Sequence, residues 1–239
     1  MTDVNLLKLL NKELRKYKTT LKFQYYDVCP FDEKNFEIME IILKYVEQFE
    51  SYYNKIFILT SLCDEYFKDS VPYLVKTYHH FLNEVYSVPI DESYLLILCD
   101  TIAKIKAFEY VDLYKGILTG PITQSAESII KMLSEFCFEE NDEIILSLVK
   151  KENLIPKAWI GDVNETCKYW CSYIALKCIV DKKDKKYLSF FNELLEDELM
   201  PWIEFTDSKY KNKLTLEWKS KYKLLVEKGI KKLYNNTAN

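Results

Sequence analysis

The sequence predicts an all-helical protein, and three observations lead to that prediction. Apolar residues recur at helical spacing along most of the chain, and no run shows the alternation with a period of two that strands require. The 239 residues include only four glycines and six prolines, far fewer than a fold rich in turns needs. The hydrophobic fraction of 49% is too high for a disordered chain. We therefore expect compact helices joined by short connections.

The first predicted helix covers residues 3–17, where leucines at helical spacing alternate with lysines and Asp3 is the expected N-cap. The second covers 32–50, which follows Pro30 and has one apolar stripe. Further helices are expected at 53–67, 70–86, 91–107, 109–118, 122–138, 142–152, 163–180, 184–199 and 215–234.

The breaks between these helices contain residues that commonly start helices. Pro72 and Pro121 stand where a first helical turn tolerates proline. Four aspartates are expected as N-caps or first-turn acids, namely Asp91, Asp142, Asp162 and Asp184. The longest irregular stretch, 201–214, is a predicted hinge before a basic terminal helix.

A repeat of about 40 residues runs through the middle of the chain. Cys63, Cys99, Cys137 and Cys178 are separated by 36, 38 and 41 positions. Three of them precede, by five or six positions, an aspartate at which a new helix is expected to begin. A period of this length, built from two helices, is typical of an α-solenoid.

The predicted helix at 163–180 is apolar on nearly all sides. Two apolar stripes lie roughly opposite each other, and only a narrow strip with Glu165, Lys168 and Ser172 is polar. Such a helix must be covered on several sides, as happens in the inner layer of a stacked array.

The residues from 162 to 176 resemble the second helix of a HEAT repeat. Cys167 stands where that family usually has valine, Lys168 where it has arginine and Cys171 where it has alanine, and an Ala-Leu pair follows. The resemblance is good in this unit and faint across 1–50 and 201–239.

This resemblance implies a right-handed α-α superhelix of about five stacked helical hairpins forming one domain over 1–239. Residues 1–50 would form an N-terminal cap region, 53–200 the HEAT-like repeats, and 201–239 the hinge and a basic capping helix.

Motifs for catalysis and cofactor binding are missing from the sequence. Its four glycines cannot form a phosphate-binding loop, and no serine has the flanking glycines of a nucleophile elbow. His79 and His80 are adjacent on a helix and point about 100° apart, so they cannot chelate one metal. We expect one to face solvent and the other to pack beside Tyr78 or Phe81. A Cys–His pair stays open, because such partners meet only in the fold. We predict no catalytic residue, no cofactor and no enzyme activity.

The seven cysteines are expected to be reduced, buried thiols of a cytoplasmic protein. The first residues lack the continuous apolar segment of a signal peptide, and no window is long and apolar enough for a membrane span. Cys167 and Cys171 have the i, i+4 spacing of two metal ligands on one helix face. No second close pair accompanies them, so we predict no structural metal site.

Charge is distributed unevenly along the chain. The formal charge is +4 over 1–22, +6 over 207–239 and −14 over 23–206, which together give the net −4. The acidic middle argues against a nucleic-acid partner, because binding to nucleic acid rests on clustered cations. Arg15 is the only arginine, so bidentate contacts to phosphate are almost impossible.

These observations predict a non-catalytic scaffold that binds a basic protein partner in an acidic concave groove, in the manner of an immunity-type or regulatory protein. The groove residues are expected to be exposed positions on the second helix of each pair, namely Glu65, Asp100, Lys104, Glu127, Lys131, Glu165 and Lys168.

Two alternatives stay open. One is an enzyme on a HEAT-like scaffold, such as a DNA-repair glycosylase. The other is that the terminal helix 215–234 is an arm for an anionic membrane or nucleic acid, although its apolar positions favour a cap. The partner's identity, the oligomeric state and a small ligand in the groove are also open.

Overall fold

The computed structural model describes residues 1–85, 93–136, 139–152, 168–196, 200, 203–205 and 210–235. In these ranges the regular elements are α-helices and short 3-10 helices, with no strand, so the predicted all-helical class is confirmed there. The chain divides into two compact units, Met1–Tyr114 and Lys115–Asn239. A single domain, a superhelix and five stacked hairpins stay predictions.

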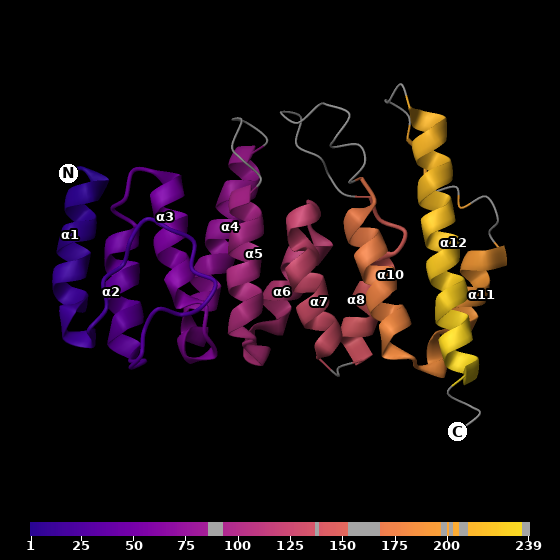
Figure 1. The fold of residues 1–239 in the computed structure, drawn as a ribbon, viewed down its shortest axis with the longest axis horizontal. Helices are drawn as coiled ribbons and strands as arrows, with labels where there is room; N and C mark the ends of the chain where they lie inside the picture. The colour runs from indigo at the N-terminus through magenta and orange to yellow at the C-terminus, as the bar shows by residue number, and fades with distance from the viewer. Residues whose placement is uncertain are drawn as a thin grey trace. The chain divides into compact units, whose positions relative to one another are not determined.

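The first unit is a set of helices that pack on their neighbours in sequence (Figure 1). Its α-helices are α1 (Asp3–Leu14), α2 (Phe36–Val46), α3 (Tyr52–Leu59), α4 (Val71–Val85) and α5 (Ser93–Ile105). Its 3-10 helices are η1 (Arg15–Tyr17), η2 (Thr60–Leu62), η3 (Glu65–Ser70) and η4 (Phe108–Tyr110). Helix α1 packs on α2, α2 on α3, and α5 on both α3 and α4. Helix α6 (Val111–Thr119) crosses the boundary between the units.

The second unit is organised around one central helix, α10 (Trp170–Lys182). The other elements that the structure describes in this unit are η5 (Gln124–Ala126), α7 (Glu127–Glu135), α8 (Glu139–Leu148), η7 (Lys185–Tyr187), α11 (Leu188–Glu196) and α12 (Lys211–Asn235). Helix α10 contacts α7, α8 and α12, and α12 also contacts α11 (Figure 1). The expectation that the helix at 163–180 is covered on several sides is therefore confirmed for its described part.

The predicted helices match the observed ones to within a few residues in most cases. Residues 3–17 form α1 and η1 without a gap. The predicted helix at 32–50 starts later, because Asn35 is the N-cap and its side chain accepts from the amide of Glu37 at 2.9 Å. The predicted helix at 53–67 is divided, because Asp64 caps η3 by accepting from the amide of Tyr66 at 3.0 Å.

The predicted caps had mixed outcomes. Asp184 caps η7 through the amide of Lys186 at 3.0 Å, and Pro72 lies in the first turn of α4, both as predicted. Pro121 was wrong as a first-turn residue, since the next helix begins three residues later. Asp142 is not an N-cap, but as the fourth residue of α8 it is a first-turn acid, as predicted, and its carboxylate also contacts other helices. Asp91 and Asp162 lie outside the described residues.

Asp3 was wrong as the cap of its own helix, since the N-cap is Thr2 and has no side-chain bond. Its carboxylate instead joins α1 to the turn between α2 and α3. It accepts from the amide of Glu50 at 2.9 Å, the amide of Ser51 at 3.1 Å and the side-chain amide of Asn54 at 2.8 Å. Backbone donors at a helix start lack intrahelical partners, so a carboxylate from another helix can satisfy them.

We expect Asp3→Ala to lower the free energy of unfolding of the first unit by about 1 kcal/mol, because it removes partly exposed hydrogen bonds to a charged group. Urea unfolding followed by circular dichroism measures this. Asp32→Ala removes an equal charge from an exposed acid and should change little. All four tryptophans lie in the second unit, so the tryptophan fluorescence transition should not move in either variant. Equal shifts for both variants would contradict the role assigned to Asp3.

The described cysteines contribute mainly to packing. Cys63, Cys99 and Cys171 are buried, Cys29 and Cys178 are half-buried, and none of the five forms a disulfide. Burial raises the pKa of the Cys63 thiol to about 11, which disfavours the reactive thiolate. Cys137 and Cys167 lie outside the described residues. Among the helices described, none is long and apolar enough to cross a membrane.

Candidate binding surfaces

Residues 18–35, which connect η1 to α2, form a long extended segment that crosses α2 and α3 in Figure 1. The segment is held at two places. The amide of Tyr26 donates to the hydroxyl of Thr60 at 3.0 Å. The ring of Phe31 packs edge-on against Phe67, with 5.9 Å between the ring centroids. These contacts place the polar residues of the segment beside η3 and α5.

Two of the predicted groove residues, Asp100 and Lys104 on α5, meet this segment. The Lys104 ammonium lies 3.0 Å from a carboxylate oxygen of Asp27 and 3.1 Å from the hydroxyl of Tyr25. The same hydroxyl is 3.5 Å from the Asp100 carboxylate. The hydrogen bond from Lys104 lowers the pKa of Asp27. Partial burial would lower the pKa of Lys104, but its bonds to Tyr25 and Asp27 raise it instead.

A third predicted residue, Glu65, lies on η3 and is exposed. Its neighbour Asp64 forms an ion pair with Lys34 at 2.6 Å, which attaches η3 to the 18–35 segment. On the other side of η3, Lys68 lies 2.5 Å from Glu109 on η4. The structure therefore brings Glu65, Asp100 and Lys104 to neighbouring elements of one unit.

Exposed apolar side chains stand among these acids. Val28 is 78% exposed, Tyr66 49% and Phe108 54%. We use the name acidic surface for this region, which comprises Asp27, Val28, Asp64, Glu65, Tyr66, Asp69, Asp100, Phe108 and Glu109. Residues 23–114 contain 16 acidic and 7 basic side chains, so the net charge of this stretch is −9.

The other predicted groove residues belong to the second unit and contact groups within it. Glu127 forms an ion pair with Lys131 and accepts from the indole of Trp170. Lys168 lies 2.8 Å from Glu152 and donates to the carbonyl oxygen of Glu204 at 2.9 Å. Glu165 lies outside the described residues.

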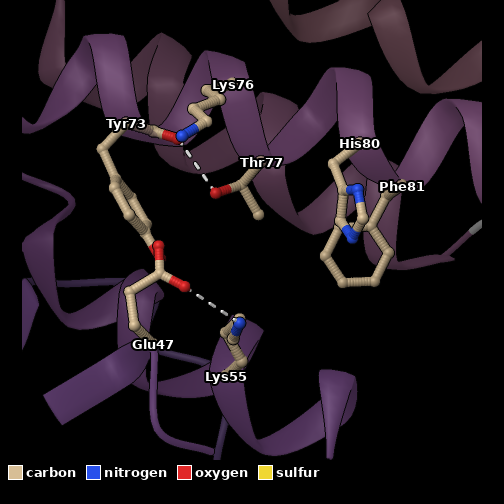
Figure 2. A pocket seen from close by; sticks show the side chains of 7 residues that line it. All are labelled: Glu47, Lys55, Tyr73, Lys76, Thr77, His80 and Phe81. Carbon is tan, nitrogen blue, oxygen red and sulfur yellow. Dashed lines mark hydrogen bonds and ion pairs between the residues drawn. The ribbon is translucent and has the colours of Figure 1, made fainter.

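The first unit also has a cleft between α2, α3 and α4 that sequence reasoning missed (Figure 2). Its volume is about 220 Å³. It is lined by Glu47, Lys55, Tyr73, Lys76, Thr77, His80 and Phe81. The five residues from α4 follow the spacing of one helix face, so a polar stripe in 70–86 was a signal present in the sequence. Glu47 and Lys55 come from other helices and had no such signal.

Ion pairs and hydrogen bonds organise the floor of this cleft. The Lys55 ammonium lies 3.5 Å from the Glu47 carboxylate, and Tyr73 donates a hydrogen bond to the same group. The hydroxyl of Thr77 donates to the carbonyl oxygen of Tyr73 at 2.9 Å. The bond from Tyr73 is the main cause that lowers the pKa of Glu47, while burial and the bond to Glu47 raise the pKa of Tyr73.

The two histidines behave as predicted. His80 is exposed, and its ring lies 6.0 Å from those of Phe81 and Tyr52. His79 is half-buried beside Tyr78, at 5.5 Å between centroids, and burial lowers its pKa.

A second cleft of about 550 Å³ lies on the second unit between α11 and α12. Its lining includes two basic residues, Lys219 and Lys223, and one acidic residue, Glu227. Within the described ranges, no group of three histidine, cysteine or acidic side chains is placed to hold a metal ion.

Comparison of the chain with protein-family models, with curated proteins and with solved structures found no match. The residues and distances above are therefore the basis for a function.

Proposed function

We propose that the chain is a non-catalytic scaffold that binds a basic protein partner through the acidic surface of the first unit. The observation that carries this proposal is that Val28, Tyr66 and Phe108 are exposed among carboxylates. Protein interfaces combine apolar and aromatic anchors with a polar rim, and charge of one sign attracts a partner of the other.

The ion pairs of this surface do not prevent a partner from binding there. In the ion pair of Asp27 with Lys104, the two side chains are 77% and 35% exposed, respectively. In the ion pair of Lys68 with Glu109, they are 52% and 43% exposed. Exposed ion pairs of this kind contribute little to stability, so a cation of the partner can replace the internal one at little cost.

A HEAT-like solenoid is the finer fold that we propose for this scaffold. The spacing of the cysteines near 40 residues and the resemblance of 162–176 to a HEAT helix support it. The contacts of α10 with three other helices are compatible with an inner layer of stacked helices. By analogy of fold and charge, the scaffold would neutralise or regulate its basic partner, as an immunity-type protein does.

Charge reversal tests the proposal. The variant Asp27→Lys, Glu65→Lys, Glu109→Lys should weaken retention of the partner, captured by the full chain at ~50 mM salt, by at least about tenfold. The control variant Asp181→Lys, Glu193→Lys, Glu217→Lys changes the net charge equally and breaks exposed ion pairs of the second unit. It should retain the partner.

Three outcomes would contradict the proposal. One is equal loss in both variants, since binding would then follow net charge alone. Another is that no protein is retained specifically at low or high salt. The third is tight binding of duplex DNA that weakens steeply as salt rises, which would favour the glycosylase alternative.

Removing the apolar anchors Tyr66 and Phe108 tests their effect on the dissociation rate separately from the effect of charge on the association rate. In Tyr66→Ala, Phe108→Ala the complex should dissociate faster with a nearly unchanged association rate, because buried contacts act mainly on dissociation and charge on association. Surface plasmon resonance with the captured partner measures both rates.

A further inference from the structure

We propose that the cleft between α2, α3 and α4 binds a carboxylate attached to a flat apolar group. This ligand class goes beyond the proposed protein-binding role, and the cleft shares no lining residue with the acidic surface.

The charges that line the cleft favour an anion. Glu47 is its one acidic lining residue, and that carboxylate is already bonded to Tyr73 and Lys55. The charges of Lys55 and Lys76 both lower the pKa of that carboxylate, and together the two lysines leave one excess positive charge in the lining. A lysine ammonium has three donors, so Lys55 also keeps donors for a ligand while it contacts Glu47.

Lys55 would strengthen the binding of an anion, because its side chain is largely removed from water. Its side chain is only 15% exposed. Figure 2 shows the Lys55 ammonium directed toward α4, where Thr77 and Tyr73 also lie. An anion in this position would receive hydrogen bonds from charged donors in a partly desolvated site, where such bonds are stronger than in water.

The other wall of the cleft is aromatic. The rings of His80 and Phe81 line it, and Tyr52 packs edge-on against Phe81 at 4.8 Å between centroids. Phe81 is fully buried, so its ring supports the exposed His80 ring from behind. A flat apolar group fits against the exposed His80 ring in a stacked or edge-on arrangement.

The volume limits the ligand to a small one. Pockets for drug-sized molecules usually span about 300–1,000 Å³, and this cleft is smaller. It therefore suits either a free aromatic acid or the aromatic C-terminal residue of a peptide, which have the same carboxylate and ring.

Histidine NMR gives a direct test, because the chain has only two histidines and both are in the first unit. The two Cε1–H signals can be assigned with His79→Gln. Titration with benzoate should shift the His80 signal with saturation, at a dissociation constant of about 1–10 mM, and should move the His79 signal far less. Sodium chloride at equal ionic strength is the reference.

Variants and probe analogues sharpen the result. Lys76→Glu should weaken benzoate binding at least about tenfold, and Lys76→Gln less. Lys22→Glu makes the same charge change at an exposed lysine outside the cleft and should bind normally. Phosphate, which lacks a ring, and benzyl alcohol, which lacks a charge, should bind more weakly than benzoate.

The proposal is overturned if ~50 mM benzoate leaves the His80 signal unshifted, if Lys76→Glu binds as the wild type does, or if phosphate or benzyl alcohol binds as tightly as benzoate. Titrations with N-acetylphenylalanine and with its amide distinguish a peptide C-terminus from a free aromatic acid as the ligand. Tighter binding of this acid than of benzoate, with no binding of the amide, indicates a peptide C-terminus. Tighter binding of benzoate indicates a free aromatic acid.

Discussion

Replacing Asp142 with alanine is expected to destabilise the second unit by about 3 kcal/mol. The Asp142 carboxylate is mostly buried and accepts from Lys182, from Lys186 at 2.7 Å and from the hydroxyl of Tyr187. It thus connects α8 to α10 and to η7. Removing it leaves two ammonium groups and a buried hydroxyl without their shared acceptor, and hydrogen bonds to charged groups are worth about 1.5–3 kcal/mol. The lysines are partly exposed and can reach water, which limits the loss.

The effect should depend on pH in a defined direction. Burial opposes ionisation of Asp142, but the bonds from the two lysines and Tyr187 outweigh it and lower the pKa. A carboxylate with a lowered pKa in the folded state stabilises the protein above the pKa of the unfolded state, about 3.9, and this contribution is lost as the pH falls through the folded value. The stability difference between wild type and Asp142→Asn should therefore shrink below about pH 4.

Tryptophan fluorescence during urea unfolding measures this change in the second unit. The matched control is Asp181→Ala, which removes an exposed carboxylate that pairs with Lys232 at 2.7 Å. Exposed ion pairs contribute little, so this variant should lie within about 0.5 kcal/mol of wild type. Equal losses for the two variants, or a difference for Asp142→Asn that grows as the pH falls, would contradict the role of Asp142.

The second large effect is expected at Gly229, which lies inside α12, six residues before its last residue. A Cβ atom built there would be 2.9 Å from a methyl carbon of Val180 on α10 and 3.2 Å from the ring of Phe191 on α11. Alanine is favoured over glycine inside a helix by about 0.5–1 kcal/mol. Overpacking of a buried contact costs about 1–3 kcal/mol, and the β-branched valine has little freedom to move away. We expect a net loss of about 1–2 kcal/mol in Gly229→Ala.

Gly116→Ala, in the same unit, is expected to change the free energy of unfolding in the opposite direction. Apart from its chain neighbours and the backbone of its own helix, no atom lies within 4 Å of a Cβ built at Gly116 in α6. Only the helix propensity changes there, so this variant should gain about 0.5–1 kcal/mol. Fluorescence-detected unfolding compares both variants. If Gly229→Ala were as stable as Gly116→Ala, α12 could not be packed as closely on α10 and α11 as the structure has it.

Local patterns in the sequence were sufficient for most of the helices, although they did not predict the later start of α2 or the division of 53–67. The apolar spacing in 3–17 predicted α1 and η1, and the double stripe in 163–180 predicted that α10 is covered on several sides. These local patterns did not predict which polar side chains are buried or which partners they have. Ser172 belonged to the expected polar strip, yet it is buried, donates to the carbonyl of Val149 and accepts from Tyr222 on α12. Only the fold supplies those partners.

The residues of the candidate surfaces were also predicted only in part from the sequence. Asp100 and Lys104 were predicted as groove residues from their positions on one helix, and the structure places both beside the Tyr25 hydroxyl. Tyr25 and Asp27 were missed, because an irregular segment has no periodicity that places its side chains. The cleft was missed because Glu47 and Lys55 come from different helices than His80.

The sequence by itself determined the helices and the uneven distribution of charge, because helical hydrogen bonds join residues four positions apart and charge is counted along the chain. The tertiary structure decided which charges meet. Lys104 reaches Asp27 across 77 positions, and Lys182 reaches Asp142 across 40. Such distances are set by how helices pack and where the 18–35 segment lies, and no local pattern contains that information.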